Sequence, residues 1–471
     1  MKIYFMGIGG VGMGNAAILA RQRGHAVAGS DGKLYPPMDG LLRRSGIEPW
    51  EGSDVARLEA FAPDLAVVGN AIARGVPEME WLLNTRRFPF LSLPDFLFRH
   101  FLANRHRIVV AGTHGKTTTS ACAAFYLRQL GIDAGYLIGG APIGFPAGAS
   151  GGDPAAPFVI EGDEYDCAFF DKRSKFVHYA PDTLIINKID FDHADIFRDL
   201  ADVQRTFSHL LRTVPGRGRV FLNGDDPNAE ALLPCPWTEI ARVGLAPHCD
   251  FRLHNFAMDG LGSHWEVDHG GGTLSLESEL LGEFNARNVT MAVLAVHAAL
   301  ATPLPERVDL RAFQGVHRRQ EKLRETENWV VYEDFGHHPR AVGEVLQTLR
   351  LHHGDCELTA CFEPATNTSM RRVLQREFSQ AFTLCDRCLL GVPRKVLAIP
   401  EAERLSQDEM VQFLRAAGVD AHCFSDNALL QLHLLEVLSR PADRRRVVVL
   451  FSNGAFPGVL SAWRDDAANG S

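Results

Sequence analysis

One segment of the chain has the composition and order of a phosphate-binding loop. It is GTHGKTTT, residues 112–119, and it follows an apolar run typical of a buried strand. In such a loop the backbone amides surround phosphate oxygens, Lys116 neutralises the β- and γ-phosphates, and the Thr117 hydroxyl reaches Mg²⁺. The full P-loop pattern has a further glycine where Val110 stands, so this loop is a shortened version. Three consecutive threonines are poor helix formers, which favours a role in nucleotide binding.

Two acidic segments follow apolar strands further along the chain. Glu161-Gly162-Asp163-Glu164 ends one strand, and the run from Asp190 to Asp195 follows another. Acids at the carboxyl edge of a parallel sheet lie where α/β proteins bind ligands. Mg²⁺ prefers oxygen ligands and keeps several waters, so one or two side chains for each ion are enough. An isolated acidic loop is usually only solvated, but two of them beside a phosphate loop predict a magnesium site.

A second glycine cluster lies near the start of the chain, between an expected strand and an expected helix. It reads Gly7-Ile8-Gly9-Gly10-Val11-Gly12, matches G-x-G-x-x-G, and is followed by Asp31 at the end of the next strand. The glycines let the backbone approach a diphosphate at the helix N-terminus, and Asp31 can bind a ribose hydroxyl. The motif alone points to NAD, although glycines can also serve only to pack a tight turn.

The elements that position these residues alternate between strand and helix in three successive units. Apolar runs predict strands over 2–6, 26–29, 65–69, 88–92, 107–111, 157–161, 183–187, 219–222, 329–333, 357–362, 387–390 and 447–451. We expect helices over 16–22, 117–130 and 285–300, a Gly/Pro-rich loop over 139–157, hairpins over 251–278, and a short helix after the Pro-rich stretch 302–305. The fold class is therefore α/β, with three tandem domains over residues 1–103, 104–312 and 313–471.

The composition is that of an ordinary soluble protein. Of 471 residues, 46% are hydrophobic and 22% are charged, and the formal net charge is −9. A negative balance disfavours nucleic-acid binding, because phosphate contacts need clustered Lys and Arg. The nine cysteines are scattered, which indicates reduced thiols, and Cys385 and Cys388 lack a second pair to complete a zinc site. We find no signal peptide or long apolar segment and expect a cytoplasmic protein without membrane insertion.

Five motifs, taken in order, resemble the Mur ligase family of ATP-dependent amide-forming enzymes. They are GTHGKTTT, IEGDEYDCAFFDKRSKFVHY, FDHADIF, GEFNARN and YEDFGHHP, and the resemblance extends over about residues 3 to 460. It implies a Rossmann-like UDP-binding domain, a central P-loop ATPase domain and a Rossmann-like C-terminal domain that closes on ATP. The run FFDKRSKFVHY with FDHADIF resembles one branch in particular. Members of that branch join UDP-N-acetylmuramate to the tripeptide L-alanyl-γ-D-glutamyl-meso-diaminopimelate in peptidoglycan recycling.

The resemblance also implies which residues bind ATP. Asn285 and Asn288 match paired asparagines near the adenine, and Asp334 matches an acid on the ribose. Arg319 matches an arginine that reaches ATP from the third domain. The remaining ATP-binding residues belong to the phosphate loop: Gly112, Thr113, His114, Gly115, Lys116, Thr117 and Thr118.

Magnesium and catalysis follow from the same resemblance. Thr117 and Glu161 are expected to bind a first Mg²⁺, and His193 a second. The expected catalytic residues are Lys116, His193 and Arg319, because a reaction between two anions depends on positioning and positive charge.

The resemblance changes the expected ligand of the first glycine cluster. In this family the N-terminal domain holds the UDP end of the acceptor, and a dehydrogenase has no use for a second phosphate loop. The local chemistry does not distinguish the two ligands, since both carry a diphosphate. Lys172 and Arg173 can pair with the carboxylates of a muropeptide. The expected substrate-binding residues are Gly9, Gly10, Gly12, Asp31, Asn70, Lys172 and Arg173.

Four positions depart from the family pattern. Phe284 stands where a histidine is common, and Glu333 where an aspartate is usual. Ala365 replaces an arginine, which bears on the peptide preference. Phe207 lies about where some members carry a carbamoylated lysine, so we expect none here.

Three other functions remain open at this point. A sister branch of the family adds L-alanine to the same acceptor. An NAD-dependent dehydrogenase would use the first glycine cluster but not Lys116, Glu161 or His193, and a P-loop switch would leave the first domain without a ligand. The expected partners are UDP-N-acetylmuramate and a muropeptide, and the expected assembly is a monomer or a weak homodimer.

Overall fold

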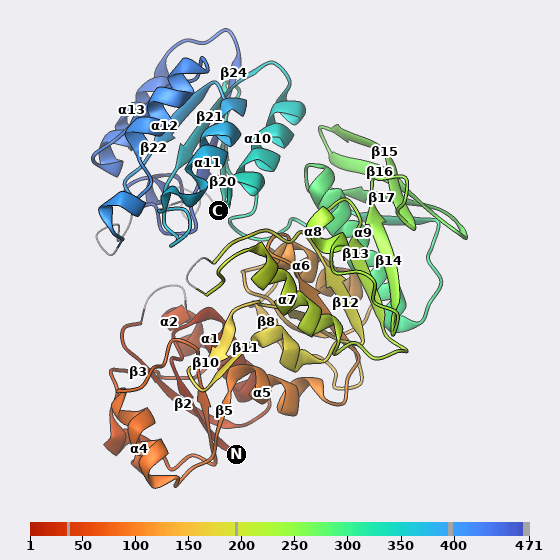
Figure 1. Ribbon diagram of the computed structural model, residues 1–471, viewed down its shortest axis with the longest axis vertical. Helices are drawn as coiled ribbons and strands as arrows, with labels where there is room; N and C mark the ends of the chain where they lie inside the picture. The colour runs from red at the N-terminus through yellow and green to blue at the C-terminus, as the bar shows by residue number, and fades with distance from the viewer. Residues whose placement is uncertain (35–37, 194–195, 394–398, 465–471) are drawn as a thin grey trace.

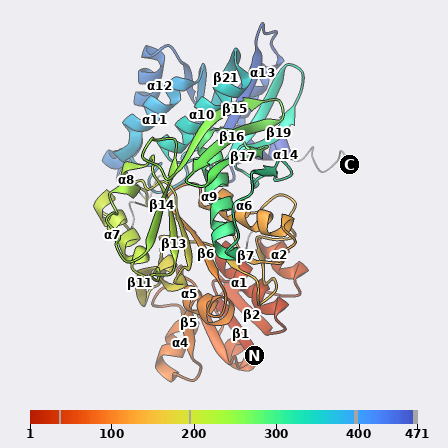
Figure 2. The same ribbon diagram turned by 90° about the vertical axis from the view of Figure 1, so that its right-hand side faces the viewer.

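The protein folds into three successive α/β units, each built on its own sheet (Figure 1). The structure, a computed structural model, describes residues 1–34, 38–193, 196–393 and 399–464. Within these residues the sheets have five, eleven and six strands, and a separate two-stranded ribbon accompanies them. The units lie one above another along the long axis, from the N-terminal unit at the bottom to the C-terminal unit at the top (Figures 1 and 2). The α/β fold class is confirmed, and the predicted domain boundaries stay a prediction.

The N-terminal sheet is parallel throughout, in the order β3-β2-β1-β4-β5. Its strands are β1 (Lys2–Met6), β2 (Ala26–Asp31), β3 (Trp50–Glu51), β4 (Leu65–Val68) and β5 (Phe90–Ser92). Its helices are α1 (Val11–Gln22), α2 (Met38–Arg44), α3 (Val55–Phe61), α4 (Pro77–Thr85), α5 (Leu93–Leu97) and a π-helical turn, η1 (Phe98–Leu102). Strands β2 and β4 lie on opposite sides of β1, so the carboxyl ends of β1 and β4 flank the switch point where such sheets bind ligands.

The central sheet has the order β18-β17-β16-β15-β14-β13-β12-β6-β9-β7-β8. Its strands are β6 (Arg107–Ala111), β7 (Gly135–Leu137), β8 (Ala149–Ser150), β9 (Phe158–Glu161), β12 (Thr183–Ile186), β13 (Arg219–Asn223), β14 (Glu239–Gly244), β15 (Phe251–Asp259), β16 (Gly262–His269), β17 (Gly272–Ser278) and β18 (Arg307–Leu310). The ribbon consists of β10 (Asp166–Ala168) and β11 (Asp171–Ser174). Strands β14 to β6 and β9 run parallel, while β15 to β17 form the expected antiparallel hairpins.

Helices cover both faces of the central sheet. They are α6 (Lys116–Gln129), α7 (Leu200–Leu211), α8 (Pro227–Glu230), α9 (Glu283–Leu300) and a 3₁₀ turn, η2 (Lys175–Tyr179). Alternate residues of the buried strands point to opposite faces: Val110 packs in one core cluster with α6 and α9, and Val109 in another with α7. The apolar runs of these strands are continuous because both faces are covered.

One predicted element of the central unit is wrong. The short helix expected after residues 302–305 is instead strand β18, which pairs in parallel with β17. Val308 and Leu310 point into the core, whereas Arg307 is exposed. This alternation of period two suits a sheet edge, and the pairing with β17 outweighs local helix propensity.

The C-terminal sheet has the order β19-β20-β24-β21-β22-β23 and is parallel except for β19. Its strands are β19 (Glu321–Glu325), β20 (Trp329–Asp334), β21 (Cys356–Phe362), β22 (Arg387–Leu390), β23 (Asp420–Cys423) and β24 (Arg445–Phe451). Its helices are α10 (Pro339–His353), α11 (Gln375–Ala381), α12 (Gln407–Ala416), α13 (Asn427–Ser439) and α14 (Leu460–Arg464), with 3₁₀ turns η3 (Arg372–Leu374), η4 (Phe382–Leu384) and η6 (Glu401–Glu403). Among the described residues, no helix combines the length and apolar character that a membrane span requires.

Candidate active site

A cleft between the central and C-terminal units collects the residues that the sequence predicts for ATP and Mg²⁺. The cleft is open to solvent and holds about 1240 Å³ of empty space. Every predicted ATP or metal residue lines it except Gly112: Thr113, His114, Gly115, Lys116, Thr117, Thr118, Glu161, His193, Asn285, Asn288, Arg319 and Asp334. These residues come from six separate segments. The fold brings them together at the carboxyl ends of β6, β9, β12 and β20, at the start of α9 and just before Glu321, where the C-terminal sheet begins.

The phosphate loop is held in one shape by its glycines and by a neighbouring strand end. Gly112 and Gly115 have φ values of +139° and +80°, which favour glycine. A Cβ atom on Gly115 would lie 2.8 Å from Asn288 Oδ1. The amide of Thr113 donates to the carbonyl of Lys188 at 2.7 Å. Helix α6 starts directly after the loop with no side-chain cap, so its first amides are available to an anion.

Lys116 lies at the base of the loop with its side chain 13% exposed, and its ammonium contacts several protein oxygens. Its Nζ donates to the carbonyl of Gly112 and to Glu164 Oε2, each at 2.6 Å. Burial disfavours the charge, but Glu164 and two neighbouring acids outweigh burial and raise the pKa of Lys116. The ammonium is therefore positively charged in the cleft, where it can pair with phosphate. The acidic segment 161–164 points to this pair, but no sequence signal connects Glu164 with Lys116.

Thr117 and Glu161 form a pair suited to Mg²⁺. Thr117 Oγ1 donates to Glu161 Oε1 at 3.1 Å, and the Gly139 amide donates to the other carboxylate oxygen at 2.7 Å. Adjacent oxygens of an octahedral Mg²⁺ at about 2.1 Å lie about 3 Å apart, so this pair matches two ligands of one ion. Burial raises the pKa of Glu161, although Lys116 acts against it. A bound cation would favour the ionised carboxylate.

His193 contacts the same carboxylate as Lys116, through its other oxygen. Its Nε2 is 3.3 Å from Glu164 Oε1, and its amide donates to Asp192 Oδ1 at 2.7 Å. Its φ is +57°, an uncommon value for a non-glycine residue. Burial opposes protonation, yet Glu164 and Asp192 together raise the pKa of His193. The following residues, Ala194 and Asp195, lie outside the described residues.

The predicted adenine residues begin helix α9. Asn288 Nδ2 donates to Asn285 Oδ1 at 3.2 Å, and Asn285 Nδ2 donates to the carbonyl of Leu281 and to Gln320 Oε1. Both asparagines are buried, which requires such partners. Phe284 lines the same cleft and packs against the C-terminal core.

Arg319 and Asp334 enter the cleft from the C-terminal side. The guanidinium of Arg319 stacks 4.4 Å from the centre of the Phe335 ring. Asp334 accepts from the amides of Gln320 at 2.9 Å and Gly336 at 2.6 Å. Burial raises the pKa of Asp334, although the charge of Arg319 acts against it. Both side chains are thus held in place by neighbouring groups of the protein.

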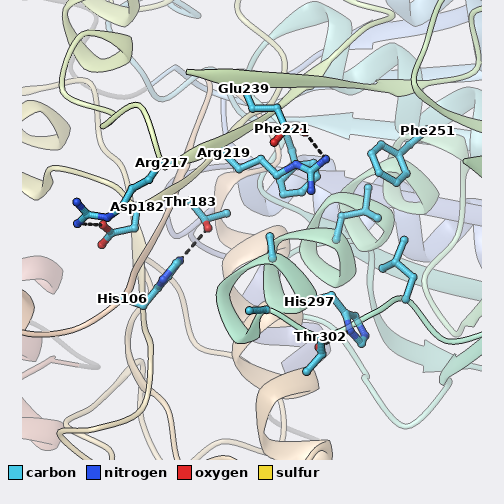
Figure 3. A pocket seen from close by; sticks show the side chains of 15 residues that line it. His106, Asp182, Thr183, Arg217, Arg219, Phe221, Glu239, Phe251, His297 and Thr302 are labelled. Atoms are coloured by element: carbon cyan, nitrogen blue, oxygen red, sulfur yellow. Dashed lines mark hydrogen bonds and ion pairs between the residues drawn. The ribbon is translucent and has the colours of Figure 1, made fainter. Parts of the chain in front are cut away.

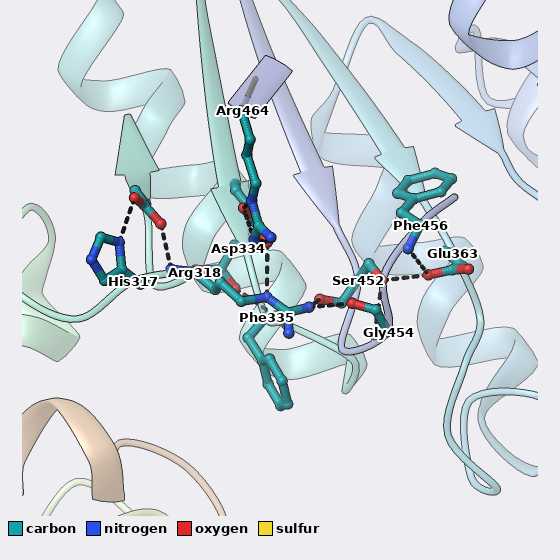
Figure 4. A network of polar contacts seen from close by, with 12 residues as sticks. His317, Arg318, Asp334, Phe335, Glu363, Ser452, Gly454, Phe456 and Arg464 are labelled. Atoms are coloured by element: carbon teal, nitrogen blue, oxygen red, sulfur yellow. Dashed lines mark hydrogen bonds and ion pairs between the residues drawn. The ribbon is translucent and has the colours of Figure 1, made fainter. Parts of the chain in front are cut away.

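The neighbouring Arg318 fixes this segment to the C-terminal sheet (Figure 4). Arg318 Nε donates to Glu333 Oε1 at 2.8 Å, and its Nη2 donates to the carbonyls of Ser452 and Gly454 at 2.7 and 2.6 Å. Glu333 is fully buried and also pairs with Arg464 at 2.5 Å. Arg318 and Gln320 both have positive φ, so the surrounding contacts hold Arg319 between two strained residues. No sequence motif predicts this network.

Several contacts close the C-terminal unit onto the central one. His337 Nε2 lies 3.2 Å from Asp192 Oδ2, and Lys188 Nζ donates to Glu344 Oε1 at 2.5 Å. His114, in the phosphate loop, contacts His338 at the start of α10 with ring centres 4.9 Å apart. The C-terminal unit therefore contacts the central unit directly beside the cleft.

The first glycine cluster forms a second candidate site, in the N-terminal unit. The Gly9 amide donates to Asp31 Oδ2 at 2.8 Å, while Asp31 Oδ1 accepts from the Gly32 amide at 2.7 Å. Asp31 therefore shapes the loop, a role that the sequence did not indicate. Gly10 precedes α1 without a side-chain cap, and Gly12 lies in the first turn of that helix. Asn70 is exposed just after β4, so it lies on the other side of the switch point.

Lys172 and Arg173 do not join the ATP cleft. They lie on β11, are mostly exposed, and pair with Asp166 and Asp171 respectively. The β10–β11 ribbon instead contacts the N-terminal unit, where Phe170 meets Phe90 with ring centres 5.3 Å apart. Their role in binding a peptide stays a prediction.

A further hollow lies at the opposite, amino-terminal edge of the central sheet (Figure 3). Arg219 pairs with Glu239 at 2.6 Å, Arg217 lies 3.5 Å from Asp182, and His106 contacts the Thr183 hydroxyl at 2.9 Å. Its arginines are thus paired with acids. The ATP cleft has its phosphate loop at the other edge of the same strands, where parallel sheets bind ligands.

Comparisons with known proteins agree with this arrangement. Residues 2–105 match the model of the "Mur ligase family, catalytic domain", and residues 110–296 match the "Mur ligase middle domain". A ligase from Escherichia coli K12 is 38% identical, over 99% of this chain and 98% of its own. The chain therefore belongs to the Mur ligase family.

Within the family, the chain is more similar to ligases of one kind than to ligases of another. The Escherichia coli relative is named UDP-N-acetylmuramate–L-alanyl-γ-D-glutamyl-meso-2,6-diaminoheptandioate ligase. A crystal structure of a murein peptide ligase from Psychrobacter arcticus 273-4 covers 100% of this chain and 99% of its own, with 33% identity and a TM-score of 0.69. A UDP-N-acetylmuramate–L-alanine ligase from Desulfitobacterium hafniense Y51 is 30% identical, over 94% of this chain and 95% of its own.

Proposed function

We propose that this protein uses ATP to join UDP-N-acetylmuramate to L-alanyl-γ-D-glutamyl-meso-diaminopimelate. The observation that carries the proposal is the single cleft in which Lys116, Glu161, Arg319 and Asp334 meet from two units of the fold. The substrates follow from the names of the full-length relatives, of which the ligases for this tripeptide show the higher identity.

The residues of the cleft suit ATP and magnesium. Thr117 and Glu161 would hold one Mg²⁺, and His193 a second, which in the bound state neutralise phosphate charge. Lys116 would release Gly112 and Glu164 to pair with the γ-phosphate. Asn285 and Asn288 would lie at the adenine, and Asp334 on the ribose.

The reaction has two steps in this proposal. A lactyl carboxylate oxygen of the acceptor attacks the γ-phosphorus, the bond to the bridging oxygen breaks, and ADP leaves. The α-amine of the tripeptide then attacks the carbonyl carbon of the acyl phosphate, loses a proton, and displaces inorganic phosphate. Both reactants of the first step are anions, so Lys116 and Arg319 contribute by positioning them and by offsetting their charge. Arg319 is well suited because its guanidinium is already fixed over Phe335.

The UDP end of the acceptor suits the first glycine cluster. The diphosphate would lie on the uncapped start of α1, close to Gly9, Gly10 and Gly12. Lys172 and Arg173 would face the acceptor or the peptide near the boundary of the first two units. Ala365 stands where relatives are expected to carry an arginine, so the length of the preferred peptide is the least constrained feature.

A competition between amine donors tests the proposal. Purified protein, ATP, Mg²⁺ and UDP-N-acetylmuramate are supplied with equal limiting concentrations of L-alanine, the tripeptide and the matching tetrapeptide. We expect the tripeptide product to form fastest. Faster formation of the L-alanine product would place the chain in the sister branch, and NAD binding without UDP-sugar binding would restore the dehydrogenase alternative.

A further inference from the structure

Three ligand-type side chains meet at the contact between the phosphate loop and the C-terminal unit. His114 belongs to the loop, Asp190 follows β12, and His338 precedes α10. One ligand atom from each lies within 4.8 Å of the others. None of the three belongs to the pair expected to bind the first Mg²⁺, Thr117 and Glu161.

Each of the three side chains has a buried polar atom without a hydrogen-bond partner: His114 Nε2, Asp190 Oδ2 and His338 Nδ1. His114 Nε2 and Asp190 Oδ2 face each other at 3.2 Å, a distance at which they pair only when the imidazole is protonated. Asp190 and His338 are only 4% and 5% exposed, so water offers little compensation. Buried polar atoms are nearly always satisfied, and three convergent exceptions in one place therefore indicate a missing partner. Since both imidazoles and the carboxylate can donate lone pairs, a cation suits all three atoms.

The donor set and spacing favour a zinc-type ion. Two imidazole nitrogens and one carboxylate oxygen, with a fourth position for water, are common ligands of Zn²⁺, whereas Mg²⁺ prefers oxygen alone. Ligands of a tetrahedral ion at about 2.1 Å lie about 3.4 Å apart, and His114 Nε2 is 3.2 Å from Asp190 Oδ2. His114 and His338 line the cleft, so the fourth position faces solvent or a phosphate.

The surroundings hold the carboxylate in place. Arg340 pairs with the other oxygen, Asp190 Oδ1, at 2.7 Å, which leaves Oδ2 directed at His114. The backbone of Asp190 exchanges two hydrogen bonds with the Thr113 hydroxyl, at 3.0 and 3.1 Å. Such contacts orient a ligand for a metal ion.

We propose that His114, Asp190 and His338 form a transition-metal site, selective for Zn²⁺ over Mg²⁺, that ties the phosphate loop to the C-terminal unit. One bound ion would link the central unit to the C-terminal unit beside the cleft. Zn²⁺ would therefore stabilise this arrangement of the two units. The inference does not depend on which substrates the enzyme joins.

Co²⁺ titration of the full chain tests this site directly. Millimolar Mg²⁺ is included to fill the magnesium ligands, and the visible absorption of four-coordinate Co²⁺ is recorded. We expect one Co²⁺ per chain, displaced by Zn²⁺. The affinity should fall about 100-fold or more in His338→Ala and in Asp190→Asn. The matched control is His337→Ala, the neighbouring imidazole, which should keep the signal.

Melting temperatures and the type of cobalt absorption band complete the test. Zn²⁺ should raise the melting temperature of the wild type but not of His338→Ala, and the metal-free melting curve of each variant shows that it is folded. A second cluster in the described residues, Cys167, Asp171 and His178, would reveal itself by a thiolate-to-cobalt band. That band, an unchanged signal in His338→Ala, or no Co²⁺ binding in the presence of Mg²⁺ would overturn the proposal.

Discussion

Replacing Lys116 with methionine separates the structural and catalytic effects of one charge. The substitution keeps most of the side-chain volume but removes the ammonium that pairs with Glu164 at 2.6 Å. The Glu164 side chain is only 2% exposed, so its charge is left in a buried site. Removing one partner of a buried ion pair costs about 3–5 kcal/mol. His193 remains 3.3 Å from Glu164 and still offsets part of its charge. We therefore expect the free energy of unfolding to fall by about 3 kcal/mol, the lower end of this range.

The loss of stability in Lys116→Met should become smaller as the pH falls. Although burial acts against it, Lys116 and His193 hold the pKa of Glu164 below its usual value, so the wild type keeps the stability of this carboxylate down to acidic pH. In Lys116→Met the ammonium that lowers the pKa of Glu164 is gone, so burial raises this pKa. Protonation then relieves the buried charge, and the stability difference between the variant and the wild type should shrink as the pH falls from 7 to 5.

The assay pairs chemical unfolding with turnover. Lys116→Met should lose about a thousandfold or more in rate, or about 4 kcal/mol of transition-state stabilisation. The double variant Lys116→Met/Glu164→Gln removes the buried charge, so it should regain most of the stability and none of the activity. Near-normal turnover in folded Lys116→Met, or a stability loss that does not vary with pH, would refute this reasoning.

Three further predictions test separate parts of the two candidate sites. Thr117→Val should raise the Mg²⁺ concentration for half-maximal activity at least about tenfold, measured at saturating ATP, with Thr119→Val as the control that lies outside the cleft. The raised pKa of His193 means that its charged form stabilises the fold at low pH and that this contribution is lost as the pH rises through its pKa. The stability gap between wild type and His193→Gln should thus narrow from pH 6 to pH 9, and a constant gap would count against the Glu164 contact. Calorimetry should detect UDP-N-acetylmuramate but not NAD, and Gly9→Ala should weaken the UDP-sugar because its Cβ would lie 2.9 Å from the Asp31 carboxylate.

Much of the fold follows from short-range patterns. Strands β1 and β6 have the predicted bounds, because their buried apolar runs end at glycine-rich turns. Helix α1 begins at Val11, earlier than the predicted Ala16, since the glycine cluster itself enters the helix. The helix predicted where β18 lies is wrong because pairing with β17, and not the local sequence, determines the structure of this segment.

Some residues of the candidate site can also be predicted from local patterns, whereas others depend on contacts between distant segments. Lys116 and Glu161 follow strands at the same sheet edge, so parallel topology alone places them together. Arg319 could be assigned only by resemblance, because its position depends on the pairing of Arg318 with buried Glu333. The cluster of His114, Asp190 and His338 could not be predicted from the sequence either. Its residues come from three loops in two units of the fold, and only the folded structure brings them together.

An isotope experiment tests the central claim, that the cleft transfers the γ-phosphate of ATP to the carboxylate of UDP-N-acetylmuramate. The acceptor is prepared with ¹⁸O in its lactyl carboxylate and turned over with ATP and the tripeptide. The released inorganic phosphate should carry one ¹⁸O, and phosphate release should require both acceptor and tripeptide. Unlabelled phosphate, label in AMP, or phosphate release without the acceptor would contradict the account.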